Sequence, residues 1–229
     1  MNSPDLHASM SPTRPIRPTR LPGPAGPVIL ALFAAAVLVD LGSLLLGAET
    51  GHRIAKPLLM PLLAAYTAVR GGPRLLVCAL LLGWGGDVFL LSDADWAFLV
   101  GMGSFAVGHV CYLVLFGRGG TPRWLGPLYA VLLVAALVLL WPGLPAELRV
   151  PVAAYATLLT VMAWRAAVVG PLAAAGGALF LVSDLIIAID VAEMPQPPAT
   201  DFWIMFLYSM GQLLLMLGLL ARHRTRRSG

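Results

Sequence analysis

The chain has 229 residues, of which 59% are hydrophobic and only 11% are charged. Soluble domains carry about 25% charged residues, so this composition excludes a soluble globular protein and predicts a single-domain integral membrane protein. The formal net charge is +4. Because the basic residues gather in particular loops, we interpret this charge as a topology signal and not as a nucleic-acid-binding surface.

The first 26 residues are rich in Pro, Ser and Arg and show no apolar period, which predicts a disordered tail. Apolar segments then alternate with short breaks that contain Gly and Pro, which predicts an all-α bundle. We expect eight transmembrane helices, most of them near the roughly 20 residues that a bilayer requires, followed by a basic tail over 222–229. The expected helices cover 27–47, 55–70, 74–92, 96–117, 123–141, 149–168, 171–191 and 202–221.

The positions of the basic residues predict the orientation of this bundle. If the N-terminus is cytoplasmic, the inner segments hold twelve of the 15 Lys and Arg residues, as the positive-inside rule requires. Eight spans bring the C-terminus back to the same side. Arginine is used far more often than lysine, which is typical of a bacterial protein from a GC-rich genome. We therefore predict a multi-pass protein of the bacterial inner membrane with both termini in the cytoplasm.

Two aspartates interrupt the apolar helices. Asp87 lies in LLVCALLLGWGGDVFLL and Asp184 lies in PLAAAGGALFLVSDLIIAI. A charged side chain at the centre of a membrane-spanning helix costs roughly 2.5 to 3.5 kcal/mol. Such residues usually face the interior of the bundle or a water-filled cavity and function there. The two aspartates therefore predict one shared functional site.

The two halves of the chain resemble each other around these aspartates. Each aspartate is followed by an apolar run, and the next helix carries His109 in one half and Gln212 in the other, each directly after a glycine. We predict a 4+4 parallel repeat, which would place Asp87 and Asp184 at similar depth on helices of the same direction. There they could form a carboxylate pair. Chance resemblance between apolar helices is the alternative.

Further polar side chains are candidates for substrate binding. His109 could carry a proton or donate to a substrate, or could be a hydrogen-bonded core residue. Lys56 could bind a phosphate or extend to the membrane interface, and Asp40 is left without a role. Cys78 and Cys111 lack metal-ligand spacing and the spans hold no His/Cys cluster, so we expect no metal and no cofactor. The alternative is a metal ion held by Asp87, Asp184 and His109. The candidate substrate-binding residues are Lys56, His109, Tyr112, Tyr155, Ser183, Tyr208 and Gln212.

Five motifs in chain order resemble a known family. The segments Lys56-Pro57, LGWGGDVFLL, FAVGHVCY, GALFLVSDLIIA and YSMGQLLL are similar to those of the YhhN/TMEM86 family of membrane proteins, the lysoplasmalogenases. The resemblance covers about residues 27–221. It implies hydrolysis of the vinyl ether bond of a lysoplasmalogen, a lysophospholipid, to a fatty aldehyde and glycerophosphoethanolamine or glycerophosphocholine. It also implies that Asp87 and Asp184 are the catalytic pair.

This chemistry suits two carboxyl groups. A proton delivered to the alkene carbon gives an oxocarbenium ion, and water then adds to form a hemiacetal that collapses. One protonated and one ionised carboxyl group can supply the proton and stabilise the cation or activate the water, as in glycosidases. The sequence does not say which aspartate is the acid. Two alternatives remain open: a proton-coupled transporter or lipid-binding protein that uses the same carboxylates, and a scaffold whose aspartates only fix helix packing.

Overall fold

The computed structural model describes residues 25–92 and 94–228. Within them the chain forms eight α-helices and no strand, which confirms the predicted all-α bundle. The predicted tail over 1–26 lies outside the described residues except for its last two, which begin the first helix. The helices are α1 (Ala25–Leu45), α2 (Glu49–Val69), α3 (Arg74–Phe89), α4 (Asp95–Phe116), α5 (Leu125–Leu140), α6 (Ala146–Ala166), α7 (Pro171–Val191) and α8 (Thr200–Ser228).

Two of the predicted helix ends differ from the structure by more than three residues. We expected the second helix to begin at residue 55, but α2 begins at Glu49, and we expected the last helix to end at 221, but α8 continues to Ser228. Both predictions equated the end of an apolar run with the end of a helix. A helix can continue into water, and its ends favour the charges found here, Glu49 in the first turn of α2 and Arg226 and Arg227 in the last turn of α8.

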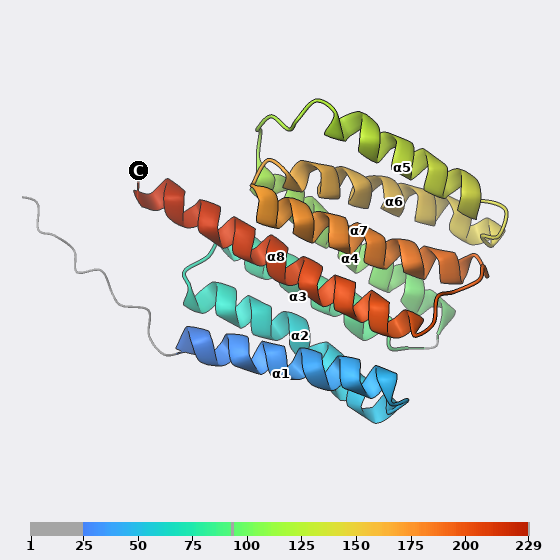
Figure 1. Cartoon of the computed structure of the whole chain (residues 1–229), viewed down its shortest axis with the longest axis horizontal. Coiled ribbons are helices and arrows are strands. Elements are labelled where there is room, and N and C mark those ends of the chain that lie inside the picture. The colour runs from blue at the N-terminus through green and yellow to red at the C-terminus, as the bar shows by residue number, and fades with distance from the viewer. Residues whose placement is uncertain (1–24, 93, 229) are drawn as a thin grey trace, which may run out of the picture.

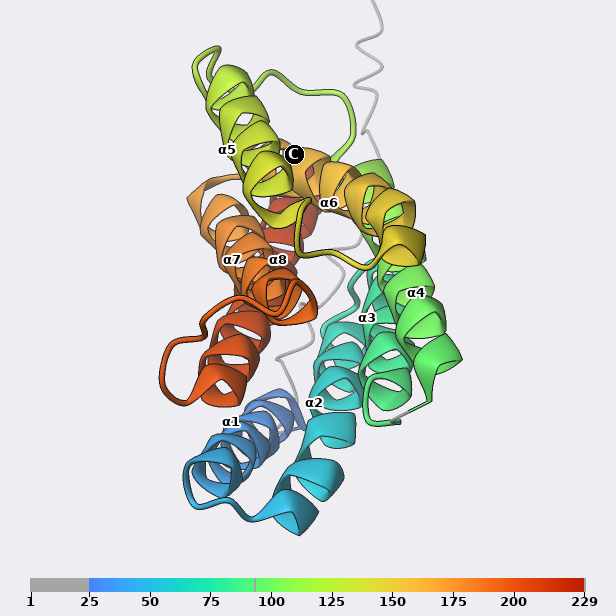
Figure 2. The same ribbon diagram turned by 90° about the vertical axis from the view of Figure 1, so that its right-hand side faces the viewer.

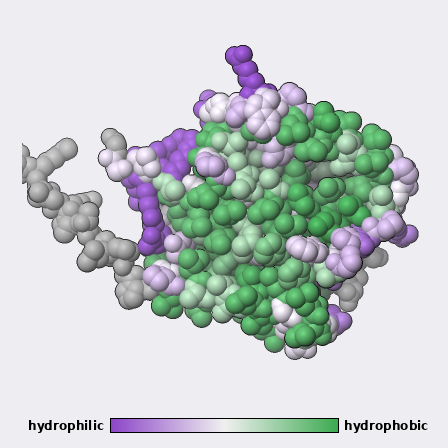
Figure 3. All heavy atoms as spheres, in the orientation of Figure 1, coloured by the Kyte–Doolittle hydropathy of each residue, from purple (hydrophilic) through white to green (hydrophobic). Residues whose placement is uncertain are grey.

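The lengths and surfaces of the helices are those of a multi-pass membrane protein. Five helices, α1, α4, α6, α7 and α8, are long and apolar enough to cross a membrane, and α5 is a shorter apolar helix. Of the others, α3 has 16 residues and α2 carries charged residues in its first turns. Hydrophobic side chains dominate the face shown in Figure 3, and hydrophilic ones lie around its edge. Such a surface fits a lipid environment.

The most closely packed helices are consecutive in the chain and antiparallel, and α5 lies at the outside. The closest pairs are α1 with α2, α3 with α4, and α7 with α8, while α4 also contacts α6 (Figure 1). Figure 2 shows α1 and α2 on one side of the bundle and α5 on the opposite side. Within the described residues, α5 packs mainly on α6 and α7, and its only buried residue is Leu140. It is therefore the most loosely held helix of the bundle.

Glycines allow α7 and α8 to pack backbone against backbone. A Cβ atom on Gly176 would lie 2.6 Å from the backbone nitrogen of Leu215 and 2.7 Å from the carbonyl oxygen of Gly211. Small residues allow this close approach of membrane helices. The contact fixes Asp184 of α7 in position relative to Tyr208 of α8.

The 4+4 repeat stays a prediction. The packed pairs α1/α2, α2/α3 and α3/α4 have counterparts in α5/α6, α6/α7 and α7/α8, as a repeat requires. The α5/α6 contact is, however, less extensive than the α1/α2 contact, so the two halves are not packed alike.

Candidate active site

The two aspartates occupy comparable positions on their helices but have different surroundings. Each lies about 20 Å along the axis from the first residue of α3 or α7, at a rise of about 1.5 Å per residue. Asp87 is buried, with 2% of its surface exposed, and lines none of the cavities described below. Asp184 is partly exposed and borders two of them. Of the two aspartates, Asp184 is the one that borders these cavities.

A hydrogen-bonded chain runs from α4 through α6 to Asp184. The hydroxyl of Tyr155 donates to Oδ2 of Asp184. The Nε2 atom of His109 lies 3.2 Å from the same Tyr155 oxygen. Because the Tyr155 hydroxyl uses its proton to donate to Asp184, the Tyr155 oxygen can only accept a hydrogen bond from His109. His109 therefore carries a proton on Nε2 in this arrangement. The Nδ1 atom of His109 is buried and has no partner within the described part of the chain.

Two separate hydrogen bonds lie near Asp87. The hydroxyl of Tyr208 donates to Oδ2 of Asp87 over 2.8 Å, and the hydroxyl of Tyr112 donates to Oε1 of Gln212 over 2.6 Å. A Cβ atom on Gly83 would lie 3.3 Å from both Nε2 of Gln212 and the Tyr208 oxygen. The absence of a side chain at Gly83 therefore lets the polar groups of α8 approach α3 closely.

Aromatic rings lie between the His109–Tyr155–Asp184 chain and the Tyr208–Asp87 hydrogen bond. Phe105, Phe180 and Tyr208 pack edge to face with centroid distances of 5.3 to 6.1 Å, and the His109 ring lies 5.0 Å from that of Phe180. Within the described residues, no hydrogen bond joins Asp87 to Asp184. Each carboxyl group has its own tyrosine instead of sharing a proton directly with the other.

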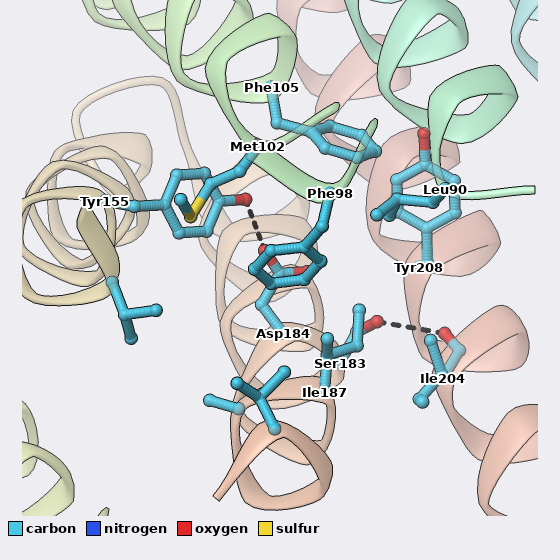
Figure 4. A pocket seen from close by; sticks show the side chains of 13 residues that line it. Leu90, Phe98, Met102, Phe105, Tyr155, Ser183, Asp184, Ile187, Ile204 and Tyr208 are labelled. Carbon is cyan, nitrogen blue, oxygen red and sulfur yellow. Dashed lines mark hydrogen bonds between the residues drawn. The ribbon is translucent and has the colours of Figure 1, made fainter. Parts of the chain in front are cut away.

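We name the first cavity beside Asp184 the inner cavity; it has a volume of about 70 Å³. It lies between α4, α6, α7 and α8, and Figure 4 shows Tyr155 and Asp184 pointing toward each other in its wall. Ser183 also lines it, but its hydroxyl donates to the carbonyl oxygen of Ile204 over 3.0 Å. Tyr208 contributes its ring to the wall, while its hydroxyl is bonded to Asp87.

Behind the same tyrosine lies a second space, the lateral cavity, of about 200 Å³ between α5, α6 and α7. It shares Val152, Tyr155, Asp184 and Ala188 with the inner cavity. Apart from Tyr155, Asp184 and Thr160, its lining is entirely apolar. The Tyr155–Asp184 pair is therefore part of the wall of both cavities.

A third space, the polar cavity, has a volume of about 470 Å³ and lies at the end of the bundle where α1 turns into α2. It is lined by charged side chains, among them Arg53 and Lys56, and shares Leu90 with the inner cavity. Nδ1 of His52, in the same wall, lies 2.8 Å from Oδ1 of buried Asp40. Sequence reasoning missed this pair because it placed His52 before the start of the second helix.

Comparison with known proteins identifies the family. The sequence pattern of the YhhN family matches residues 51–219. The chain belongs to the YhhN family. Among its relatives are human lysoplasmalogenase TMEM86B, 36% identical over 152 residues, and bovine lysoplasmalogenase TMEM86A, 35% identical over 143 residues. The rat lysoplasmalogenase TMEM86B is 34% identical over 174 residues, which cover 72% of this chain and 70% of the relative.

The match to the human protein covers 66% of this chain and 65% of the relative, and the match to the bovine protein covers 58% of this chain and 59% of the relative. The chain therefore spans less than two thirds of the length of either relative. No solved structure matches this YhhN-family chain.

The YhhN-family fold brings some of the predicted site residues together and separates others. Asp184, Tyr155, Ser183 and Tyr208 surround the inner cavity, with His109 directly behind Tyr155. Tyr112 and Gln212 bond to each other in the core and line none of the three cavities, and Lys56 lies in the polar cavity. Among the described residues, no group of three His, Cys, Asp or Glu side chains could hold a metal ion.

Proposed function

We propose that this YhhN-family protein hydrolyses the vinyl ether bond of lysoplasmalogens inside the membrane, releasing a fatty aldehyde and a glycerophospho-headgroup. The observation that carries the proposal is the Tyr155–Asp184 pair, a hydrogen-bonded carboxyl group in a membrane helix that borders two cavities. The relatives named lysoplasmalogenase support the reaction class.

Asp184 is the acid in this proposal. An ionised carboxylate away from water is costly, so Asp184 begins the reaction protonated. It gives its proton to the alkene carbon farther from the ether oxygen, and the π electrons form the new C–H bond. The other alkene carbon becomes an oxocarbenium ion, to which water adds while the Asp184 carboxylate takes up one water proton. The resulting hemiacetal breaks its C–O bond to the glycerol, giving the aldehyde and a free glycerol hydroxyl.

Tyr155 and His109 support the change of charge on Asp184. When Asp184 loses its proton, the Tyr155 hydroxyl donates to the new carboxylate, and a hydrogen bond to an ionised group is stronger than one to a neutral group. His109 in turn donates Nε2–H to the Tyr155 oxygen and holds the hydroxyl in this orientation. We assign His109 as a positioning residue, not as a substrate ligand, because Tyr155 lies between it and the cavities.

Asp87 has a different role in this proposal. It is buried behind the ring of Tyr208 and does not reach a cavity, so it acts without touching the substrate. Asp87 accepts the hydrogen bond of Tyr208 and so holds the ring of Tyr208 in the wall of the inner cavity. The two aspartates are therefore unequal: Asp184 transfers protons and Asp87 positions a residue of the cavity wall.

The three cavities outline a path for one lipid molecule. The polar cavity offers Arg53 and Lys56 to a phosphate, and Leu90 lines both this cavity and the inner cavity. The vinyl ether bond lies only a glycerol unit away from the phosphate, which brings it to the inner cavity beside Asp184. With both termini in the cytoplasm, as we propose from the positive-inside pattern, the polar cavity opens toward the outer side of the inner membrane.

The test is aldehyde release by the purified protein from a lysoplasmalogen. We expect release from the vinyl ether substrate and none from the saturated alkyl ether with the same headgroup, because only the alkene carbon accepts the proton. Asp184→Asn should remove the activity, and Asp190→Asn, an exposed aspartate on the same helix, should retain it. Proton-dependent uptake of lipid into liposomes without aldehyde would contradict the proposal.

A further inference from the structure

We infer that the lateral cavity binds the hydrocarbon chain of the substrate and that its shape sets the chain-length preference of the enzyme. This inference rests on the proposed function, because it takes the substrate to be a single-chain vinyl ether lipid. It assigns a role to a space between α5, α6 and α7 that the protonation step itself does not use.

The first argument is size. A long alkenyl chain extends directly from the vinyl ether bond, so it must begin beside Asp184. The inner cavity, at about 70 Å³, has no room for it in addition to the glycerol unit. The lateral cavity, at about 200 Å³, begins at the same Tyr155–Asp184 pair and is the larger of the two spaces that border the acid. It is the natural continuation of the substrate path.

The second argument is the chemistry of the lining. Leu133, Ala136 and Leu137 of α5 and Ala156 and Leu159 of α6 line the cavity, so beyond the reacting end its wall is hydrocarbon apart from Thr160. A phosphate or a glycerol would find a single hydroxyl group in this part of the wall. An aliphatic chain is therefore the occupant that fits.

The third argument is access. Leu132, Val182 and Leu185 line the cavity and are 49%, 45% and 37% exposed, as expected for a cavity that opens to the side of the bundle. The helix that covers it, α5, has a single buried residue and is the peripheral helix of the fold. A chain can enter sideways from the bilayer between α5 and α7 without leaving an apolar environment.

The bilayer limits how strongly the cavity can discriminate. A chain that moves from lipid into the lateral cavity gains no hydrophobic transfer energy, because both surroundings are apolar. Chain-length preference must therefore come from packing and from steric exclusion. One methylene group in a well-packed apolar pocket changes specificity by roughly tenfold or more, so filling part of the cavity should give an effect of at least about tenfold on long chains.

The experiment compares two neighbouring alanines of α5. Ala136 lines the lateral cavity, whereas Ala135 is exposed and does not. Ala136→Phe should lower kcat/KM for a long-chain lysoplasmalogen by about tenfold or more relative to a short-chain one, and Ala135→Phe should leave this ratio at the wild-type value. Leu137→Ala, which widens the cavity, should shift the ratio in the opposite direction and serves if Ala136→Phe does not fold.

A measurement that needs no turnover separates this inference from the proposed function. A lysophosphatidylethanolamine probe with a diazirine in its chain should label α5, α6 and α7 of the wild-type protein, and Ala136→Phe should lose the label. If the wild-type protein is active and both alanine variants keep its ratio of long-chain to short-chain kcat/KM, the inference is wrong and the proposed function stands. Equal labelling by a two-chain phospholipid probe would also overturn the inference, because the cavity would then hold bulk bilayer lipid. Failure to release aldehyde, with the labelling intact, would instead overturn only the proposed reaction.

Discussion

The replacement Tyr155→Phe tests the mechanism with the smallest change that the site allows. It removes one hydroxyl and keeps the ring, which borders both cavities and lies 5.6 Å from the ring of His109. The lost hydroxyl donates to Asp184 and lies within hydrogen-bonding distance of His109. Both partners keep their places in the helices but lose this contact.

The expected size of the effect follows from those bonds. A hydrogen bond to a charged group contributes about 1.5 to 3 kcal/mol. If this energy is gained only when Asp184 becomes a carboxylate, the loss of the hydroxyl slows the reaction by about 10- to 150-fold. The conversion is about 1.4 kcal/mol for each factor of ten in rate. The neutral bond to His109 contributes less to the rate, but its loss leaves a buried polar atom unpaired and lowers the unfolding free energy by about 1 to 3 kcal/mol.

The assay is aldehyde release from a lysoplasmalogen, followed by the oxidation of NADH by added alcohol dehydrogenase, with thermal unfolding in detergent measured in parallel. Tyr129→Phe on α5 is the matched control, because no side-chain hydrogen bond involves Tyr129 among the described residues. We expect Tyr155→Phe to lower kcat with little change in KM and Tyr129→Phe to change neither. Wild-type kcat in Tyr155→Phe would refute the role of the hydroxyl.

Three further predictions concern the frame that holds the site. Gly176→Ala should destabilise the protein by about 1 to 3 kcal/mol, because a Cβ atom there would lie 2.6 Å from the backbone of α8. Gly103→Ala, with open space around its Cβ position, should not destabilise it. Thermal unfolding would show the difference. Arg165→Ala should lower the unfolding free energy by about 1 kcal/mol, because the Arg165 guanidinium donates to the carbonyl oxygens of Gly117 and Gly119 after α4. Alanine at exposed Arg118 should leave the unfolding free energy unchanged in the same measurement. A reporter fused to the C-terminus should be active in the cytoplasm, and periplasmic activity would contradict the proposed topology.

Much of the fold could be predicted from the sequence because apolar runs and polar breaks are strong signals. Every expected helix is present, and the aspartates of α3 and α7 stood out as carboxylates in apolar surroundings. The rotation of each helix about its axis could not be predicted. Helices such as α7 and α5 are apolar around most of their circumference, so no stripe in the sequence marks the face that points inward.

The partners of the aspartates were hidden for the same reason. Tyr155 and Asp184 are 29 residues apart, and Tyr208 and Asp87 are 121 residues apart, so no local spacing connects them. Gly83 is a local feature of this arrangement, since a glycine one turn before Asp87 allows a neighbouring group to approach closely. The inequality of the two aspartates depends on which of them borders a cavity, and this follows only from the packing of the whole helix bundle.

The most direct test of the central claim is the order of activity in Asp184→Asn and Asp87→Asn, measured as aldehyde release under single-turnover conditions. Both proteins should still bind a diazirine-labelled lysolipid, which shows that they are folded. We predict that Asp184→Asn releases no aldehyde above background and that Asp87→Asn retains a reduced but measurable rate. Wild-type release by Asp184→Asn, or the reverse order of the two variants, would contradict the assignment of Asp184 as the acid.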